Sequence, residues 1–297
     1  MNQKWAPFLV LIAAVLWGTT GTTQAMAPEH AHPIAIGATR LAVGGLFLLV
    51  LLLATRHFKL RSLPVKMTIF ASLCMALYQP LFFSAVSITG VAVGTVVAIG
   101  SAPVFSGLTE WAFLKVRPTK TWWFSTALSI TGCFMLFAHQ TSTFVDPIGI
   151  LMSLGAGLSF ALYTLCSRQL VHTSSPLSVV AIVFTLSALW LSPLLFMYDL
   201  SWILSYRGIG VSLQLGIVTT GIAYFLFAKG LTRISPSTAV TLSLAEPLTA
   251  TLFGVFLLGE RLSGLSWTGI FMLIVGIGLL MLPKEVLAGR KIVRIEQ

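Results

Sequence analysis

The chain has 297 residues, of which 57% are hydrophobic and only 9% are charged, and its mean hydropathy is +0.95. Globular domains carry about 25% charged residues, so this composition excludes an ordinary soluble fold. The formal net charge of +10 does not indicate a nucleic-acid-binding protein, because the charges lie in short connectors between apolar stretches.

Each apolar stretch is about twenty residues long, the length of helix that crosses a hydrocarbon core about 30 Å thick. Ten such spans are predicted, at 6–26, 34–54, 66–86, 91–114, 121–139, 148–168, 177–197, 209–229, 236–258 and 265–283. Runs such as 41–54 are continuously apolar, whereas strands of a transmembrane barrel would alternate in polarity. Since backbone polar groups in lipid must be paired within their own segment, we predict an all-α integral membrane protein.

The first span is predicted to be retained as a helix. Ala25-Met26-Ala27 has the small-x-small pattern of a signal-peptide cleavage site. However, Pro28 follows at once, only Lys4 precedes the span, and the apolar stretch is longer than that of a typical signal peptide.

Basic residues are distributed unequally between the two sides of the predicted membrane. Three of them, Arg40, Arg207 and Arg261, belong to one side. Fifteen belong to the side of the N-terminus: Lys4, Arg56, Lys59, Arg61, Lys66, Lys115, Arg117, Lys120, Arg168, Lys229, Arg233, Lys284, Arg290, Lys291 and Arg294. The positive-inside rule therefore predicts a multi-pass membrane protein with both termini in the cytoplasm.

The chain repeats itself at an offset of 144 residues. Without any gap, this offset pairs Pro103 with Pro247, Leu114 with Leu258, Arg117 with Arg261, Trp123 with Trp267 and Gly132 with Gly276. The pattern predicts two five-helix halves, 1–140 and 147–283, followed by a basic cytoplasmic tail at 284–297. An odd number of helices inserts the second half in the opposite direction, an arrangement that is typical of secondary transporters.

Three segments carry a resemblance to a known family. Ala245-Glu246-Pro247, the segment 257–262 and Trp267 resemble the closing helices of the EamA domain. Trp17-Gly18, and Arg40 before an apolar run, are similar to the opening of the same domain. Two such domains are the pattern of the drug/metabolite transporter superfamily, although 115–117 of the first half departs from it. The resemblance implies an inner-membrane carrier, commonly an exporter of amino acids, related metabolites or toxic organic compounds.

Glu246 is the strongest single candidate for function. It falls near the middle of the ninth span, where an ionisable group needs a partner or water. It could meet a substrate amine or take up a proton, and the alternative is a structural acid bonded between helices. Arg40 could contact a substrate carboxylate, but a structural or snorkelling role is favoured. Glu110 is expected at the membrane interface, near Lys115.

The remaining candidates are polar or aromatic residues at mid-membrane depth. The run 17–24 is unusually polar, which fits either close helix packing or the wall of a wet cavity. Aromatic walls with a few polar groups suit a modest organic solute. The predicted substrate-binding residues are Trp17, Thr20, Gln24, Tyr78, Gln79, Phe82, Tyr163, Tyr224 and Glu246, and Thr164 is expected to be equivalent to Thr20 in the other half.

No metal or cofactor is predicted. The cluster Glu29-His30-Ala31-His32 lacks the spacing of a metal site. The three cysteines, Cys74, Cys133 and Cys166, form no CxxC pair and are expected to pack as apolar residues.

The predicted function is that of a secondary transporter of a small-molecule substrate by alternating access. Proton coupling and a homodimer are both compatible with the sequence. A membrane-embedded enzyme acting on a lipid-soluble substrate is the alternative, but no GxSxG, HExxH or GxxxxGK[ST] motif is present.

Overall fold

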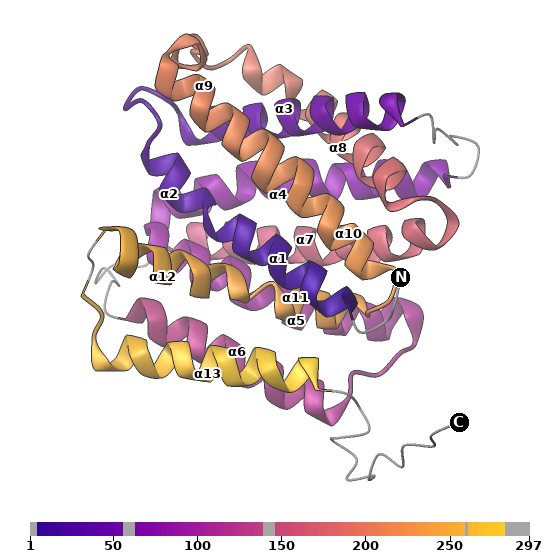
Figure 1. Cartoon of the computed structure of the whole chain (residues 1–297), viewed down its shortest axis with the longest axis vertical. Helices are drawn as coiled ribbons and strands as arrows, with labels where there is room; N and C mark the ends of the chain where they lie inside the picture. Colours follow the sequence, from indigo (N-terminus) through magenta and orange to yellow (C-terminus); the bar gives the residue numbers. More distant parts are fainter. Residues whose placement is uncertain (1–4, 56–62, 139–145, 259–260, 283–297) are drawn as a thin grey trace, which may run out of the picture.

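The computed structural model describes residues 5–55, 63–138, 146–258 and 261–282, whose regular elements are all helices (Figure 1). The first half contains α1 (Ala6–Gly18), α2 (Thr20–Ala25), α3 (Pro33–Ala54), α4 (Val65–Thr89), α5 (Val91–Leu114) and α6 (Lys120–Phe137). The predicted tail at 284–297 lies outside the described residues.

The second half continues the same all-helical pattern. It contains α7 (Pro147–Thr173), α8 (Pro176–Leu195), η4 (Ser201–Leu204), α9 (Tyr206–Leu213), η5 (Gln214–Ile222), α10 (Ala223–Leu231), α11 (Pro236–Leu242), α12 (Ala245–Leu258) and α13 (Gly264–Met281). Because α1–α2, α9–η5–α10 and α11–α12 each form one crossing, the predicted all-α fold with ten membrane-crossing segments is confirmed.

Nine helical segments of the described chain are long and apolar enough to span a membrane. The remaining crossing is α6, whose 18 residues begin with Lys120 and include the buried hydroxyl residues Ser125, Thr126 and Ser129. Thr126 Oγ1 lies 3.0 Å from Thr241 Oγ1 of α11. These three buried hydroxyl residues of α6 thus lower its hydropathy without facing lipid.

The main contacts between helices of the two halves are related by the internal repeat, because exchanging the halves turns each contact into itself or into another contact. The fifth and tenth crossings, α6 and α13, pack against each other, as do the second and seventh, α3 and α8 (Figure 1). The extensive contacts of α7 with α4 and α5 have counterparts in those of α1 with α10 and α12. These pairings are those expected for two inverted five-helix repeats.

Three crossings are irregular near mid-membrane. The first is interrupted at Thr19, whose hydroxyl donates to the carbonyl of Leu16 (2.7 Å). The ninth is interrupted at 243–244, just before Pro247. The eighth contains η5, a π-helix. Irregular backbone at this depth is tolerated where it lies within protein or lines a cavity, and π-helical turns frequently mark functional sites.

We call the side of the bundle where α1 begins and α13 ends the terminal face. The side where α2 ends and α3 begins is the distal face. Figure 1 shows these faces at the right and left of the bundle, respectively.

Candidate functional site

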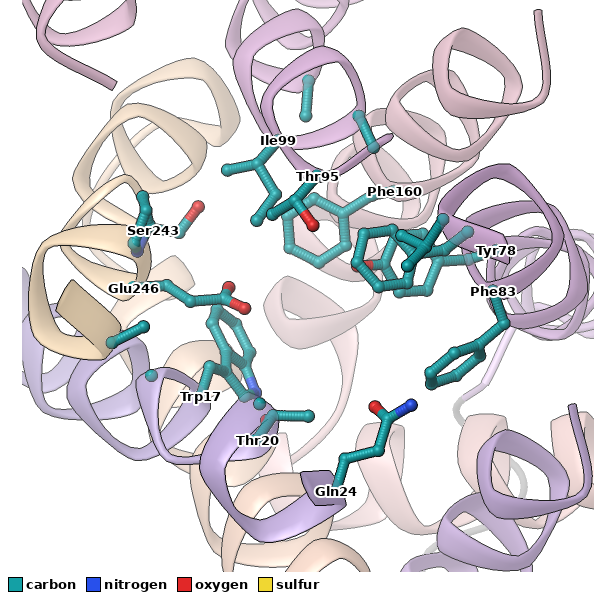
Figure 2. A pocket seen from close by; sticks show the side chains of 18 of the residues that line it. Trp17, Thr20, Gln24, Tyr78, Phe83, Thr95, Ile99, Phe160, Ser243 and Glu246 are labelled. Carbon is teal, nitrogen blue, oxygen red and sulfur yellow. The ribbon is translucent and has the colours of Figure 1, made fainter. Parts of the chain in front are cut away.

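A cavity of about 430 Å³ lies between the two halves. Its lining includes seven of the nine predicted residues, Trp17, Thr20, Gln24, Tyr78, Phe82, Tyr224 and Glu246. Figure 2 shows the Glu246 carboxyl and the Gln24 amide directed toward the open centre. Whether these side chains bind substrate stays a prediction, but the structure brings them together around one space.

The cavity extends toward the distal face. Among its lining residues are Ala25, the last residue of α2, Phe137, the last residue of α6, and Val86, near the end of α4. At its deep end it is lined by Phe160 and Tyr224, which lie near the middle of their crossings. The lining therefore spans about half of the membrane thickness.

Aromatic rings close the cavity on the side of the terminal face. We call the cluster Trp17, Phe160, Tyr163, Phe184, Tyr224 and Phe227 the aromatic floor. Ring centroids are 4.5 Å apart for Phe184 and Tyr224, 4.7 Å for Trp17 and Tyr224, and 5.3 Å for Trp17 and Phe227. Such tilted packing is a favourable geometry for aromatic pairs. The floor joins residues of both halves and separates the cavity from the helix ends below it.

Nearer the terminal face, Arg168 and Glu110 take part in hydrogen bonds between helices. Arg168 Nη1 donates to the carbonyl of Leu231 (2.6 Å). The backbone N–H of Ser237 donates to Glu110 Oε2 (3.0 Å). Glu110 is only 4% exposed, so its expected position at the membrane interface is wrong. Its carboxylate instead accepts from an otherwise unpaired amide at the start of α11, where negative charge is favourable.

Glu246 enters the cavity from the first turn of α12. Its backbone N–H donates to the carbonyl of Ser243 (2.9 Å), the residue at the interruption of the ninth crossing. Gly18 of α1 lies directly beside it, since a Cβ at that position would lie 2.9 Å from the Glu246 carbonyl oxygen. The interruption and this close helix approach fix where the carboxyl projects.

Arg40 also lines the cavity, so of the two favoured roles, structural or snorkelling, the snorkelling role is wrong. It is only 7% exposed, and its Nε donates to Thr220 Oγ1 of η5 (3.2 Å). The Thr220 hydroxyl in turn donates to the carbonyl of Leu215 (2.8 Å). Arg40 is held within the bundle by the π-helix and does not extend to the membrane interface.

Trp17 is held by the same π-helix. Its Nε1–H donates to the carbonyl of Thr219 (2.9 Å). In a π-helix each carbonyl accepts from the N–H five residues later, and not four as in an α-helix. Where the chain changes from one pattern to the other, a carbonyl can accept from a side chain of another helix. Residues from the first and second crossings are therefore both positioned by the eighth.

Gln79 and Tyr163 were predicted to face the substrate, but neither is among the lining residues. Tyr163 is 1% exposed and belongs to the aromatic floor. Gln79 is 2% exposed, and neither of its amide atoms has a hydrogen-bond partner in the part of the chain that the structure describes. The α4 residues that line the cavity are Tyr78, Phe82, Phe83 and Val86. Gln79 lies one turn before Phe83 on the same side of the helix, but its side chain is buried and does not reach the cavity.

Several lining residues were missed by the sequence reasoning. Among them are Thr95, Ile99, Ala102, Phe137 and Phe160. Thr95, Ile99 and Ala102 follow one another at four and three residues, the spacing of one helix face. Ala102 is also the repeat partner of Glu246 at the offset of 144, a signal that could have indicated the contribution of the fourth crossing.

Thr164 is not equivalent to Thr20 in this conformation. Thr20 lines the cavity, whereas Thr164 is fully buried and donates to the carbonyl of Phe160 (2.8 Å). The two halves are related by sequence, but in this conformation the cavity that Thr20 lines extends toward the distal face, whereas Thr164 is packed between helices.

Relatives of this chain are transporters by name. The "Uncharacterized transporter YwfM" of Bacillus subtilis is 53% identical over 268 residues and 90% of each chain. The "Threonine/homoserine exporter RhtA" of Salmonella typhimurium is 30% identical over 88% of this chain and 86% of its own. A solved crystal structure with 19% identity matches 98% of this chain and 100% of its own with a TM-score of 0.80, which shows the same fold.

The family model of the EamA-like transporters matches residues 4–138 and 147–282, nearly the whole chain in two parts. This match agrees with the resemblance that the sequence carries in both halves. It also excludes the alternative of a membrane-embedded enzyme, because the family consists of transporters. The chain is a multi-pass membrane transporter that belongs to the EamA-like transporter family, within the drug/metabolite transporter superfamily.

Proposed function

We propose that this protein exports small amino acids or closely related solutes by alternating access through the cavity. The main support is a polar, aromatic-lined space at mid-membrane that extends to one face and is closed toward the other. Its volume of about 430 Å³ is within the range of small-molecule sites. The relative named a threonine/homoserine exporter supports the substrate class.

The proposed orientation in the plasma membrane has both termini in the cytoplasm. Under the positive-inside rule, the terminal face is then cytoplasmic and the distal face external. The cavity is accordingly open to the outside, and the aromatic floor separates it from the cytoplasm. Export requires a second conformation in which the floor parts and the distal ends of the helices come together.

Glu246 is the proposed substrate or coupling group. A carboxyl within the bundle can bind the amine of a substrate or take up a proton, and both roles need an acid at this position. The Glu246→Gln variant keeps the length of the side chain and removes its ability to ionise. We expect this variant to insert and fold normally and to lose export.

The test uses everted membrane vesicles containing wild-type protein or Glu246→Gln, with labelled L-threonine and L-homoserine supplied outside, with and without a proton gradient. Uptake into everted vesicles corresponds to export from the cell. Glu29→Gln is the matched control, because Glu29 is exposed and lies outside the cavity lining. Wild-type flux in the Glu246→Gln vesicles would remove Glu246 from the mechanism, and absence of saturable flux with every amino acid tried would contradict the proposed substrate class.

A further inference from the structure

We infer that the cavity selects solutes that carry a positive and a negative group together, with Glu246 binding the ammonium group and Arg40 the carboxylate. This inference rests on the proposed function and assigns a separate role to each charge. It excludes simple organic cations and simple organic anions as good substrates.

The charge of the lining supports this assignment. Of the described residues that line the cavity, Arg40 and Glu246 are the two that carry a formal charge. Their charges balance, so a solute without net charge leaves the cavity neutral. A lone cation attracted to Glu246 would be repelled by Arg40, and a lone anion would meet the reverse.

The two charged groups do not neutralise each other by a hydrogen bond. Within the described residues, the hydrogen bond of the Arg40 side chain is made by Nε to Thr220 Oγ1, a neutral partner. Both side chains line the same cavity of about 430 Å³, so one small solute can contact the two groups at once.

The arrangement of the Arg40 side chain leaves its outer nitrogens for a ligand. With Nε engaged by Thr220, the two terminal nitrogens provide the paired donors that match a carboxylate. On the opposite pole, Glu246 is an acceptor when ionised, which suits an ammonium group. Figure 2 shows its carboxyl extending into the open centre of the cavity.

The rest of the lining provides phenol and apolar surface around these two groups. Tyr78 and Tyr224 line the same cavity as Glu246 and Arg40. Apolar lining residues, among them Phe82, Phe83 and Ile99, provide a wall for the remainder of the solute. A compact molecule with its ammonium and carboxylate on neighbouring atoms, as in an α-amino acid, fits this combination.

The test measures binding to the purified full-length protein by thermal stabilisation, so that it does not depend on transport. The probes are L-threonine, its cationic amide threoninamide, and the anion 3-hydroxybutyrate, which lacks the amine. A second set built on leucine consists of L-leucine, leucinamide and 4-methylpentanoate. For wild type, we expect at least one zwitterion to bind roughly tenfold or more tightly than both of its single-charge analogues.

The variants separate the two poles. Arg40→Met should reduce the preference for the zwitterion over the amide, and Glu246→Gln should reduce its preference over the deaminated acid. Arg40→Lys keeps the positive charge and should keep most of the preference, which guards against an effect of misfolding. Arg207→Met and Glu29→Gln, both at exposed residues, are matched controls and should bind like wild type.

Two results would overturn the inference. One is an Arg40→Met protein, folded by its melting curve, that keeps the full preference for the zwitterion over the amide. The other is a wild-type protein that prefers a single-charge probe or is stabilised by neither zwitterion. Flux lost in Glu246→Gln vesicles alongside either result would leave the carrier proposal in place and remove only the paired-charge assignment.

Discussion

Trp17 links the cavity wall to the helix behind it through a single buried hydrogen bond. The indole Nε1–H donates to the Thr219 carbonyl, and the ring packs against Tyr224 and Phe227. A Trp17→Phe substitution keeps most of the ring contact and leaves the Thr219 carbonyl without this donor. We expect the free energy of unfolding to fall by about 1–2 kcal/mol, measured by thermal unfolding in detergent.

Trp267→Phe provides the matched control for this measurement. Trp267 is 49% exposed on α13 and offers a similar loss of ring volume, and its indole makes no hydrogen bond to the described residues. Its replacement should change the melting temperature little. Equal losses from both substitutions would assign the effect to ring size and not to the hydrogen bond with Thr219.

For single residues, the sequence predicts the depth of a side chain in the membrane better than its contact partners. Glu246 and the Tyr78 and Phe82 face were found from depth and spacing alone. For Arg40 the sequence left a structural and a snorkelling role open, because its acceptor, Thr220, lies 180 residues later in the chain and could not be identified. The partner of Glu110 could not be identified either, since Ser237 is distant in sequence.

The π-helix η5 is the element that holds the second crossing in register. Gly44 of α3 packs directly against it, because a Cβ at Gly44 would lie 2.6 Å from Thr220 Cγ2 and 2.7 Å from the Gly216 carbonyl oxygen. Gly44→Ala must therefore displace α3 from η5. We expect a loss of about 1–3 kcal/mol in stability and weaker transport, since Thr220 holds Arg40.

Gly278→Ala is the control for this helix contact. Gly278 lies within α13, and a Cβ there would meet nothing within 4 Å. Replacing glycine by alanine inside a helix is favourable by about 0.5–1 kcal/mol when space is free. A Gly44→Ala protein as stable and active as Gly278→Ala would show that the close approach of α3 and η5 has no consequence.

Element boundaries were predicted to within a few residues because each span is bounded by charges, prolines or turn residues. The interruptions of the first and ninth crossings and the π-helix were not predicted. Average hydropathy treats a span as one apolar block, while Thr19, Leu244 and the π-helical turns depend on local hydrogen bonds and on neighbouring helices.

Across the whole molecule, the closed terminal face depends on few polar contacts. Arg168 of α7 donates to the carbonyl of Leu231 at the end of α10 and so joins the sixth crossing to the eighth. Arg168→Leu removes this donor and keeps an apolar side chain. We expect the population to shift toward the conformation open at the terminal face.

The shift can be measured with a cysteine at Ala239, which is fully buried in α11 on the terminal side of the floor. Cys74, Cys133 and Cys166 are first replaced by alanine, and a membrane-impermeant maleimide is applied to the terminal face in everted vesicles. Labelling at position 239 should rise several-fold in Arg168→Leu. A rate unchanged from the parent would mean that the Arg168 contact does not control opening.

The inverted repeat itself was predictable from the sequence, because proline, arginine, tryptophan and glycine recur in one register. What the repeat could not indicate is which face is closed. Thr20 lines the cavity and Thr164 is buried between helices. Because both are threonines at equivalent repeat positions, the conformation of the protein causes this difference and the residue type does not.

One pair of equivalent repeat positions carries an acid in the second half and none in the first, which bears on how many protons a transport cycle could use. Glu246 is the one carboxyl among the described lining residues, and its partner position in the first half is Ala102. If an ammonium group and a proton compete for that carboxyl, each export cycle exchanges at most one proton for one solute. One charge moved across 100 mV provides about 2.3 kcal/mol, which sustains a solute ratio of roughly fifty. On that premise, alanine in place of a second acid at position 102 sets the upper limit of the stoichiometry.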